Sequence, residues 1–131
     1  MQNGRYFEDF EEGQVIKHWP GRTISETDNS WFSLLTQNQH PVHIDANYAK
    51  STQHGQNLVN GLLVLAIAIG QTVADISLRG IANLDYESVT HEGPTFHGDT
   101  IYTKSTILEL RVTSKGDRGV VYLETEVTNQ R

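Results

Sequence analysis

The chain has 131 residues, of which 37% are hydrophobic and 20% charged, and these proportions exclude a disordered or collagen-like chain. Its length suits one domain over residues 1–131. Asp and Glu outnumber Lys and Arg by 16 to 10, so the net charge of −6 favours no nucleic-acid partner. Cysteine is absent, which excludes disulfides and thiolate metal sites. With no recognisable signal peptide, the expected location is cytoplasmic.

The most apolar stretch runs from Leu62 to Ile69 without a polar side chain. A membrane span needs about 20 such residues, so no membrane partner is expected. Because the stretch is apolar on all sides, we predict a helix that is buried on every side of a soluble protein.

The first third of the chain predicts one strand and one helix. A strand is expected from Val15 to about Thr23, bent at Pro20–Gly21. Ser25 is typical of a helix start, because its side-chain oxygen can accept a free backbone N–H. The helix is expected to end near Asn38, since Pro41 disfavours helical geometry at the residue before it.

The middle of the chain predicts two more helices. Asp45 can cap a short helix that runs through Ala49. A polar loop over Ser51 to Asn57 follows it. The long apolar helix is then expected from about Val59 to Ile76, with small residues along it that allow close approach by a sheet.

The remainder of the chain is typical of β-strands. Strands are expected over 84–90, 101–112 and 120–128, and the turn over 114–119 pairs the last two as an antiparallel hairpin. The order of elements therefore predicts an α+β domain in which a curved antiparallel sheet wraps round one long helix.

Polar side chains gather between Gln37 and Asp45, where the helix ends and the chain turns. We single out His43, because imidazole is the usual general acid or base near neutral pH. The alternative is a histidine that only ties down a loop through hydrogen bonds. His40, His43 and Asp45 together also suggest a metal cluster, but Pro41 interrupts their spacing and no third ligand follows at a familiar distance. We therefore expect no metal.

The stretch from Gln37 to His43 resembles the signature of the MaoC-like dehydratases and R-specific enoyl-CoA hydratases, which reads Gly-Asp-x-Asn-Pro-[Leu/Ile/Val]-His. Three further segments agree with that family. They are Asn60–Gly61 at the start of the long helix, Pro94–Thr100, and Asn129–Gln130. The resemblance covers nearly the whole chain, in the family's order.

This resemblance implies a hot-dog fold, a homodimer or assembly of dimers, and reversible addition of water to a 2-enoyl thioester of coenzyme A. The acyl-CoA, for which the resemblance includes branched and dicarboxylic esters, is the expected substrate and partner, and no separate cofactor is implied. By position, His43 corresponds to the catalytic histidine and Gly61 to the glycine whose N–H binds the thioester oxygen. Asn60 and His40 are expected to help bind the substrate. A donor at a helix start suits that oxygen, because it lies at the positive end of the helix dipole.

Asn38 stands where the family has a catalytic aspartate, and an amide cannot accept a proton. The Asn38 amide could still hold water or substrate. His43 would then act alone, or with a carboxylate from elsewhere, of which Asp45 is the nearest in sequence. Two alternatives stay open: a non-catalytic acyl-CoA-binding module and, on the same fold, an acyl-CoA thioesterase. The long helix carries no carboxylate before Asp75, which disfavours the thioesterase. The family's last strand is expected to be missing, because the sequence ends at Arg131.

Overall fold

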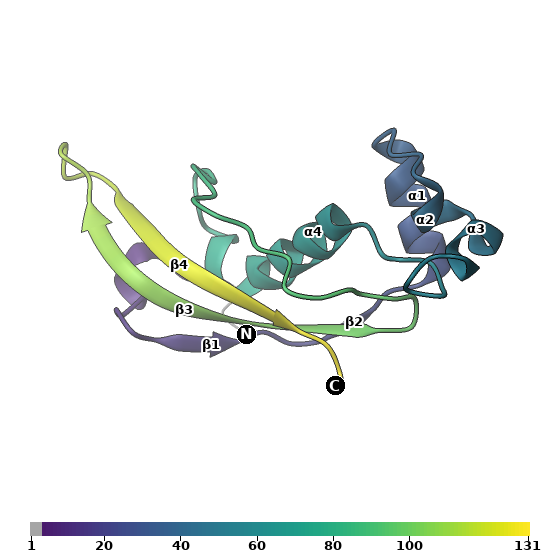
Figure 1. Cartoon of the computed structure of the whole chain (residues 1–131). Helices are drawn as coiled ribbons and strands as arrows, with labels where there is room; N and C mark the ends of the chain where they lie inside the picture. The colour runs from purple at the N-terminus through teal and green to yellow at the C-terminus, as the bar shows by residue number, and fades with distance from the viewer. Residues whose placement is uncertain (1–3) are drawn as a thin grey trace.

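The computed structural model describes residues 4–131 and has the expected α+β architecture (Figure 1). The elements in chain order are η1 (Phe7–Asp9), β1 (Val15–Lys17), β2 (Arg22–Thr23), α1 (Glu26–Leu35), α2 (Pro41–Ile44), α3 (Ala46–Lys50), α4 (Gly61–Thr72), η2 (Val73–Ser77), β3 (Thr100–Val112) and β4 (Gly119–Thr128). The sheet curves beneath α4, and α1 to α3 form a separate group beside one end of α4 (Figure 1).

The central strand of the sheet is β3, and every pairing with it is antiparallel. β1 and β2 pair with successive stretches of β3, and β4 pairs along nearly its whole length. The register of β3 and β4 shifts at Leu108, which adds one residue to β3 and increases its local bend. The predicted hairpin is therefore confirmed. The strand predicted from Val15 to Thr23 is present as two short strands, interrupted where the expected bend lies.

The start of α1 is fixed by a capping box. The Ser25 side chain accepts the Asp28 N–H at 3.1 Å, and the Asp28 carboxylate accepts the Ser25 N–H at 2.8 Å. Arg22 donates two hydrogen bonds of 2.9 Å to the same carboxylate. The Arg22 guanidinium and the Ser25 N–H together lower the pKa of Asp28 to about 2. The predicted start of this helix is confirmed.

The end of α1 is a Schellman turn. The Asn38 N–H donates to the Ser33 carbonyl at 2.8 Å, and the Gln37 N–H donates to the Leu34 carbonyl at 3.1 Å. Gln37 takes the left-handed conformation that this turn requires, with φ of 62°. The helix thus ends at Leu35, slightly before the predicted end, and the turn sets the position of Asn38.

The long apolar helix is α4, which continues through the π-helical turn η2 to Ser77. Leu63, Ala68 and Thr72 face the core, but Leu62 is 58% exposed. The prediction of a helix buried on every side is therefore wrong. An apolar composition shows that a face avoids water, but it does not show which part of the chain covers that face. Within the described part of the chain, no helix is both long and apolar enough to cross a membrane.

The predicted strand over 84–90 is also wrong: these residues are exposed and belong to no strand. A strand needs a neighbour that accepts and donates its backbone hydrogen bonds. Among residues 4–131, no segment lies in the register that would supply that neighbour. Side-chain alternation predicts an extended conformation, but the backbone hydrogen bonds to a neighbouring strand depend on the tertiary structure.

Two apolar clusters hold the domain together. One joins α4 to the sheet and consists of Ile24, Val59, Leu63 and Ile101, with Phe32, Val64 and Ile67 against them. The other lies where η1 meets the sheet and consists of Phe10, Ile16 and Ile107, with Ile76, Leu110, Val121 and Leu123 against them. The first cluster fixes the N-terminal half of α4 against β3, and this half carries the predicted site.

Candidate functional site

His43 lies on the one-turn helix α2, where the sequence predicts only a turn of the chain. Pro41 occupies the first position of that helix, where its missing N–H costs nothing and its fixed φ favours a helical start. The same proline that ends α1 in the sequence pattern therefore begins α2. Since α2 is a single turn packed between α1 and α3, it holds the His43 ring half-buried at a defined orientation.

The His43 ring is held in one tautomer. Its Nδ1 lies 2.7 Å from the Leu58 carbonyl oxygen, which can only accept, so Nδ1 carries the hydrogen. In the neutral ring the lone pair then lies on Nε2, and that atom makes no hydrogen bond within residues 4–131. A fixed Nδ1–H and a free Nε2 are what a general base requires.

Asn38 and His40 form a local unit beside His43. The Asn38 side-chain oxygen accepts the His40 N–H at 3.2 Å, and the His40 Nδ1 accepts the Val42 N–H at 3.1 Å. The two ring centroids of His40 and His43 are 6.0 Å apart. His40 is thus the N-cap of α2, while the Asn38 amide keeps both of its donor hydrogens unpaired among the described residues.

Asn60 and Gly61 form the start of α4. The Asn60 side chain accepts the Leu62 N–H at 3.0 Å and caps the helix. The Gly61 N–H makes no hydrogen bond within residues 4–131, so this donor at the positive end of α4 is available to a ligand. The role expected of Gly61 in binding the thioester oxygen stays a prediction, and Asn60 shapes the helix start as its N-cap.

Sequence reasoning gave His91 no part in the site, but its ring lies against Gly61. A Cβ built on Gly61 would lie 2.7 Å from His91 Cε1 and 3.1 Å from each ring nitrogen. His91 is exposed, and its ring makes no hydrogen bond within residues 4–131. The absence of a side chain at Gly61 allows this close contact, which brings a second imidazole to the start of α4. A lone histidine in a segment without periodicity gave no signal of this contact.

A buried asparagine, Asn29, is the other residue that sequence reasoning missed. Its side chain is fully buried and contacts the backbone of His43, Leu58 and Asn60, as well as the His97 ring. A polar residue in the middle of an amphipathic helix was the only available signal, and such residues are usually exposed.

Asp45, the carboxylate that the sequence offers as an assistant to His43, has another partner, and so does Asp99. Asp45 accepts the Tyr48 N–H at 2.9 Å and caps α3, as predicted. Burial alone would raise the pKa of Asp99, but hydrogen bonds from Gln130 and the Phe96 N–H, together with the Arg131 charge, lower it overall. In the described part of the chain, no group of three His, Asp or Glu side chains could hold a metal ion.

A second polar cluster lies at the opposite end of α4. His18 Nδ1 lies 2.7 Å from the Asp75 carboxylate, and its Nε2 lies 2.8 Å from the Ser105 hydroxyl. Ser105 is completely buried and also bonds the Thr125 hydroxyl at 2.8 Å, so it is not an accessible nucleophile. This Ser–His–Asp arrangement therefore ties the segment after β1 to η2, β3 and β4.

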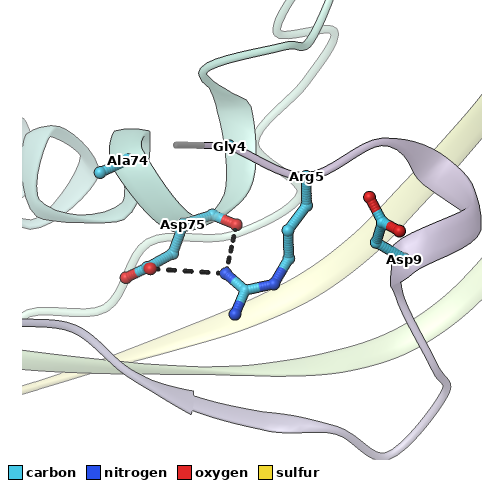
Figure 2. Close-up of a pocket in the computed structure, with 5 residues that line it drawn as sticks. All are labelled: Gly4, Arg5, Asp9, Ala74 and Asp75. Atoms are coloured by element: carbon cyan, nitrogen blue, oxygen red, sulfur yellow. Dashed lines mark hydrogen bonds and ion pairs between the residues drawn. The ribbon is translucent and has the colours of Figure 1, made fainter. Parts of the chain in front are cut away.

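A cavity of about 280 Å³ lies beside this cluster. Figure 2 shows Arg5 at this cavity, where it reaches both the Asp75 carboxylate and the Asp75 main-chain carbonyl. Asp9, Gly4 and Ala74 complete its lining. Because Ala74 and Asp75 belong to η2, the cavity is separated from Gly61 by the whole length of α4. We assign it no part in the site around His43.

Comparison with known proteins finds that the MaoC like domain family matches residues 9–130. A Beta-methylmalyl-CoA dehydratase of Chloroflexus aurantiacus is 37% identical over 97% of this chain and 36% of its own length. A mesaconyl-CoA hydratase of Cereibacter sphaeroides is 34% identical over 98% of this chain and 37% of its own length. The chain thus spans just over a third of the length of these curated relatives.

Solved structures agree with the fold. A MaoC domain protein from Chloroflexus aurantiacus J-10-fl superposes with a TM-score of 0.91 at 37% identity, over 97% of this chain and 36% of that one. A monoamine oxidase regulatory protein from Archaeoglobus fulgius gives a TM-score of 0.85 at 34% identity, over 98% and 86% of the two chains. A Mycobacterium tuberculosis protein described as a double hot-dog fold also matches, with a TM-score of 0.86 at 29% identity. The predicted hot-dog fold is confirmed.

Proposed function

The chain belongs to the MaoC-like domain family, and from that premise we propose that it adds water reversibly to a 2-enoyl thioester of coenzyme A. The observation that carries the proposal is the state of His43. Its Nδ1–H is fixed on the Leu58 carbonyl, which leaves Nε2 as a free base. The unpaired Gly61 N–H supplies the second requirement, a donor for a developing oxyanion.

In the proposed reaction, His43 Nε2 takes a proton from water while the water oxygen bonds to the β carbon of the enoyl group. The electron pair of the double bond moves toward the carbonyl, and the Gly61 N–H stabilises the enolate oxygen. The α carbon then takes a proton from His43, which restores the neutral ring. The same steps in reverse order remove water from the 3-hydroxyacyl thioester.

Asn38 has the role of holding water or substrate. Its amide donors are unpaired, but the group cannot accept a proton. The acid–base work then rests on His43 alone, because the Asp45 carboxylate already caps α3. His40 contributes by fixing the start of α2, and its ring lies close enough to His43 to border the same substrate.

The names of the two relatives support a branched dicarboxylic acyl-CoA as substrate, since mesaconyl and β-methylmalyl groups both carry a second carboxylate. No cofactor beyond the coenzyme A of the substrate is proposed.

A second copy of this chain is the proposed partner. Large apolar side chains left exposed support it: Leu62 at 58%, Trp31 at 76% and Leu35 at 81%. Light scattering at micromolar concentration tests this, and a monomer contradicts it.

The activity is tested with crotonyl-CoA and mesaconyl-CoA, by the loss of the enoyl thioester absorbance. His43→Ala should lower the rate by about 10²–10⁴, because it removes the only proposed acid–base group. It also removes the bond to Leu58, so unfolding in urea should be measured beside it. A His43→Ala protein that keeps most of the wild-type rate contradicts the assignment.

One observation favours a second candidate, a non-catalytic acyl-CoA-binding module: Asn38 replaces the acid that the family pattern would place there. Binding of a CoA ester without turnover by the wild-type chain would support it. Thioester hydrolysis finds less support, because Asp75 lies roughly 20 Å along the helix from Gly61 and is paired with His18 and Arg5. Release of free thiol from the ester would reverse that judgement.

A further inference from the structure

We propose that Asn29 is the positioning residue of this site, holding His43 and the start of α4 in one fixed arrangement. This inference rests on the proposed function. Asn29 lies in the middle of α1, and its side chain is completely buried, so its amide must find every partner within the protein. Those partners come from all the segments that carry the site.

The Asn29 amide makes four contacts. Its nitrogen lies 3.2 Å from the His43 carbonyl, 3.0 Å from the Leu58 carbonyl and 2.9 Å from His97 Nε2. Its oxygen accepts the Asn60 N–H at 2.9 Å. One side chain therefore joins α2, the chain before α4, the start of α4 itself and the loop before β3.

The orientation of this amide follows from its partners. The backbone carbonyls of His43 and Leu58 can only accept, and the backbone N–H of Asn60 can only donate. Flipping the amide would place oxygen against two carbonyls and nitrogen against an N–H, so only one orientation satisfies all three groups. The same nitrogen lies 2.9 Å from His97 Nε2, so its two hydrogens are shared among three acceptors. Because the amide nitrogen cannot accept, Nε2 directs its lone pair at it, which assigns the hydrogen of the neutral His97 ring to Nδ1.

The Leu58 carbonyl links this network to the proposed base. One of its lone pairs accepts His43 Nδ1–H at 2.7 Å, and another accepts from Asn29 at 3.0 Å. Asn29 thus fixes the group that fixes the His43 tautomer, and it also binds the His43 main chain directly. Because it holds the N–H of Asn60 as well, it sets the position of the neighbouring Gly61 N–H relative to His43 Nε2.

The test compares Asn29→Asp with Asn57→Asp. In the first variant the aspartate side chain keeps the shape of asparagine and the oxygen that accepts from Asn60, but it loses the donors. Asn57 is a matched control, since its buried amide donates to the Val42 carbonyl of α2 at 3.0 Å. Among the described residues it makes no side-chain hydrogen bond to His43 or to α4. Both variants should unfold at lower urea concentrations than the wild type.

Only Asn29→Asp should lower kcat for crotonyl-CoA, by about 10²-fold, because a misplacement of about 1 Å in a catalytic site costs that much in rate. KM should change by less than about threefold. An equal kcat for the two variants would overturn the positioning role.

A second readout does not depend on activity. Long-range ¹H–¹⁵N correlation spectra of the wild-type histidines should show hydrogen on Nδ1 of both His43 and His97 at neutral pH. Hydrogen on Nε2 of wild-type His97 would overturn the proposal, even if the Asn29 variant failed to fold. If the wild type hydrates no CoA ester while the spectra are as expected, the proposed function fails and the network stands.

Discussion

Gly61→Ala separates the chemistry of the site from the stability of the fold. The new Cβ would lie 2.7 Å from His91 Cε1, well inside van der Waals contact. His91 is exposed and its ring is unpaired among the described residues, so the ring can move away by about 1 Å at little cost. Gly61 has a backbone conformation that alanine adopts readily, and alanine is favoured over glycine in a helix by up to about 1 kcal/mol. The free energy of unfolding should therefore stay constant or rise slightly.

The hydration rate should change in the opposite direction. The added methyl group crowds the approach to the Gly61 N–H, and loss of one such donor costs about 10²–10³ in kcat. Gly70→Ala is the matched control on the same helix, because a Cβ there meets no atom within 4 Å. Both variants should be measured by urea unfolding and by enoyl thioester absorbance. A Gly61→Ala protein with wild-type kcat would refute the oxyanion role, and one that is destabilised by more than about 1 kcal/mol would refute the reasoning about His91.

Three further predictions concern other parts of the chain. Asn38→Asp places a new negative charge where the enolate or a substrate carboxylate would lie, so turnover of mesaconyl-CoA should fall by about tenfold or more. A higher turnover on every substrate tested would contradict a site adapted to asparagine. Because the pKa of Asp28 is lowered to about 2, its bond to Arg22 stabilises the fold at neutral pH, and this contribution disappears as pH falls from about 4 to 2. Asp28→Asn should therefore cost about 1 kcal/mol at pH 7, after allowance for solvent screening, and progressively less in acid urea titrations. His18→Ala leaves the partly buried Asp75 carboxylate without one of its partners and should cost about 2–4 kcal/mol in urea unfolding, while kcat per folded molecule is unchanged.

The sequence determined the local elements and their order. Ser25 and Asp28 form a capping box because their side chains satisfy backbone groups only three residues away. The turn between β3 and β4 likewise follows from residues adjacent in the chain. The motif around His43 pointed to the family by the types and spacing of its residues, and the family match over residues 9–130 confirms it.

The tertiary structure decided which of these groups meet. Residues 84–90 have the composition of a strand but lack a partner in the described chain, and α4 is apolar all round but covered on one face. His91 lies 30 residues beyond Gly61, and Asn29 lies 31 residues before Asn60, so neither contact has a signal at short range. Local propensities act over one or two turns of chain, whereas a buried amide with four distant partners exists only once α1, α2 and α4 have packed together.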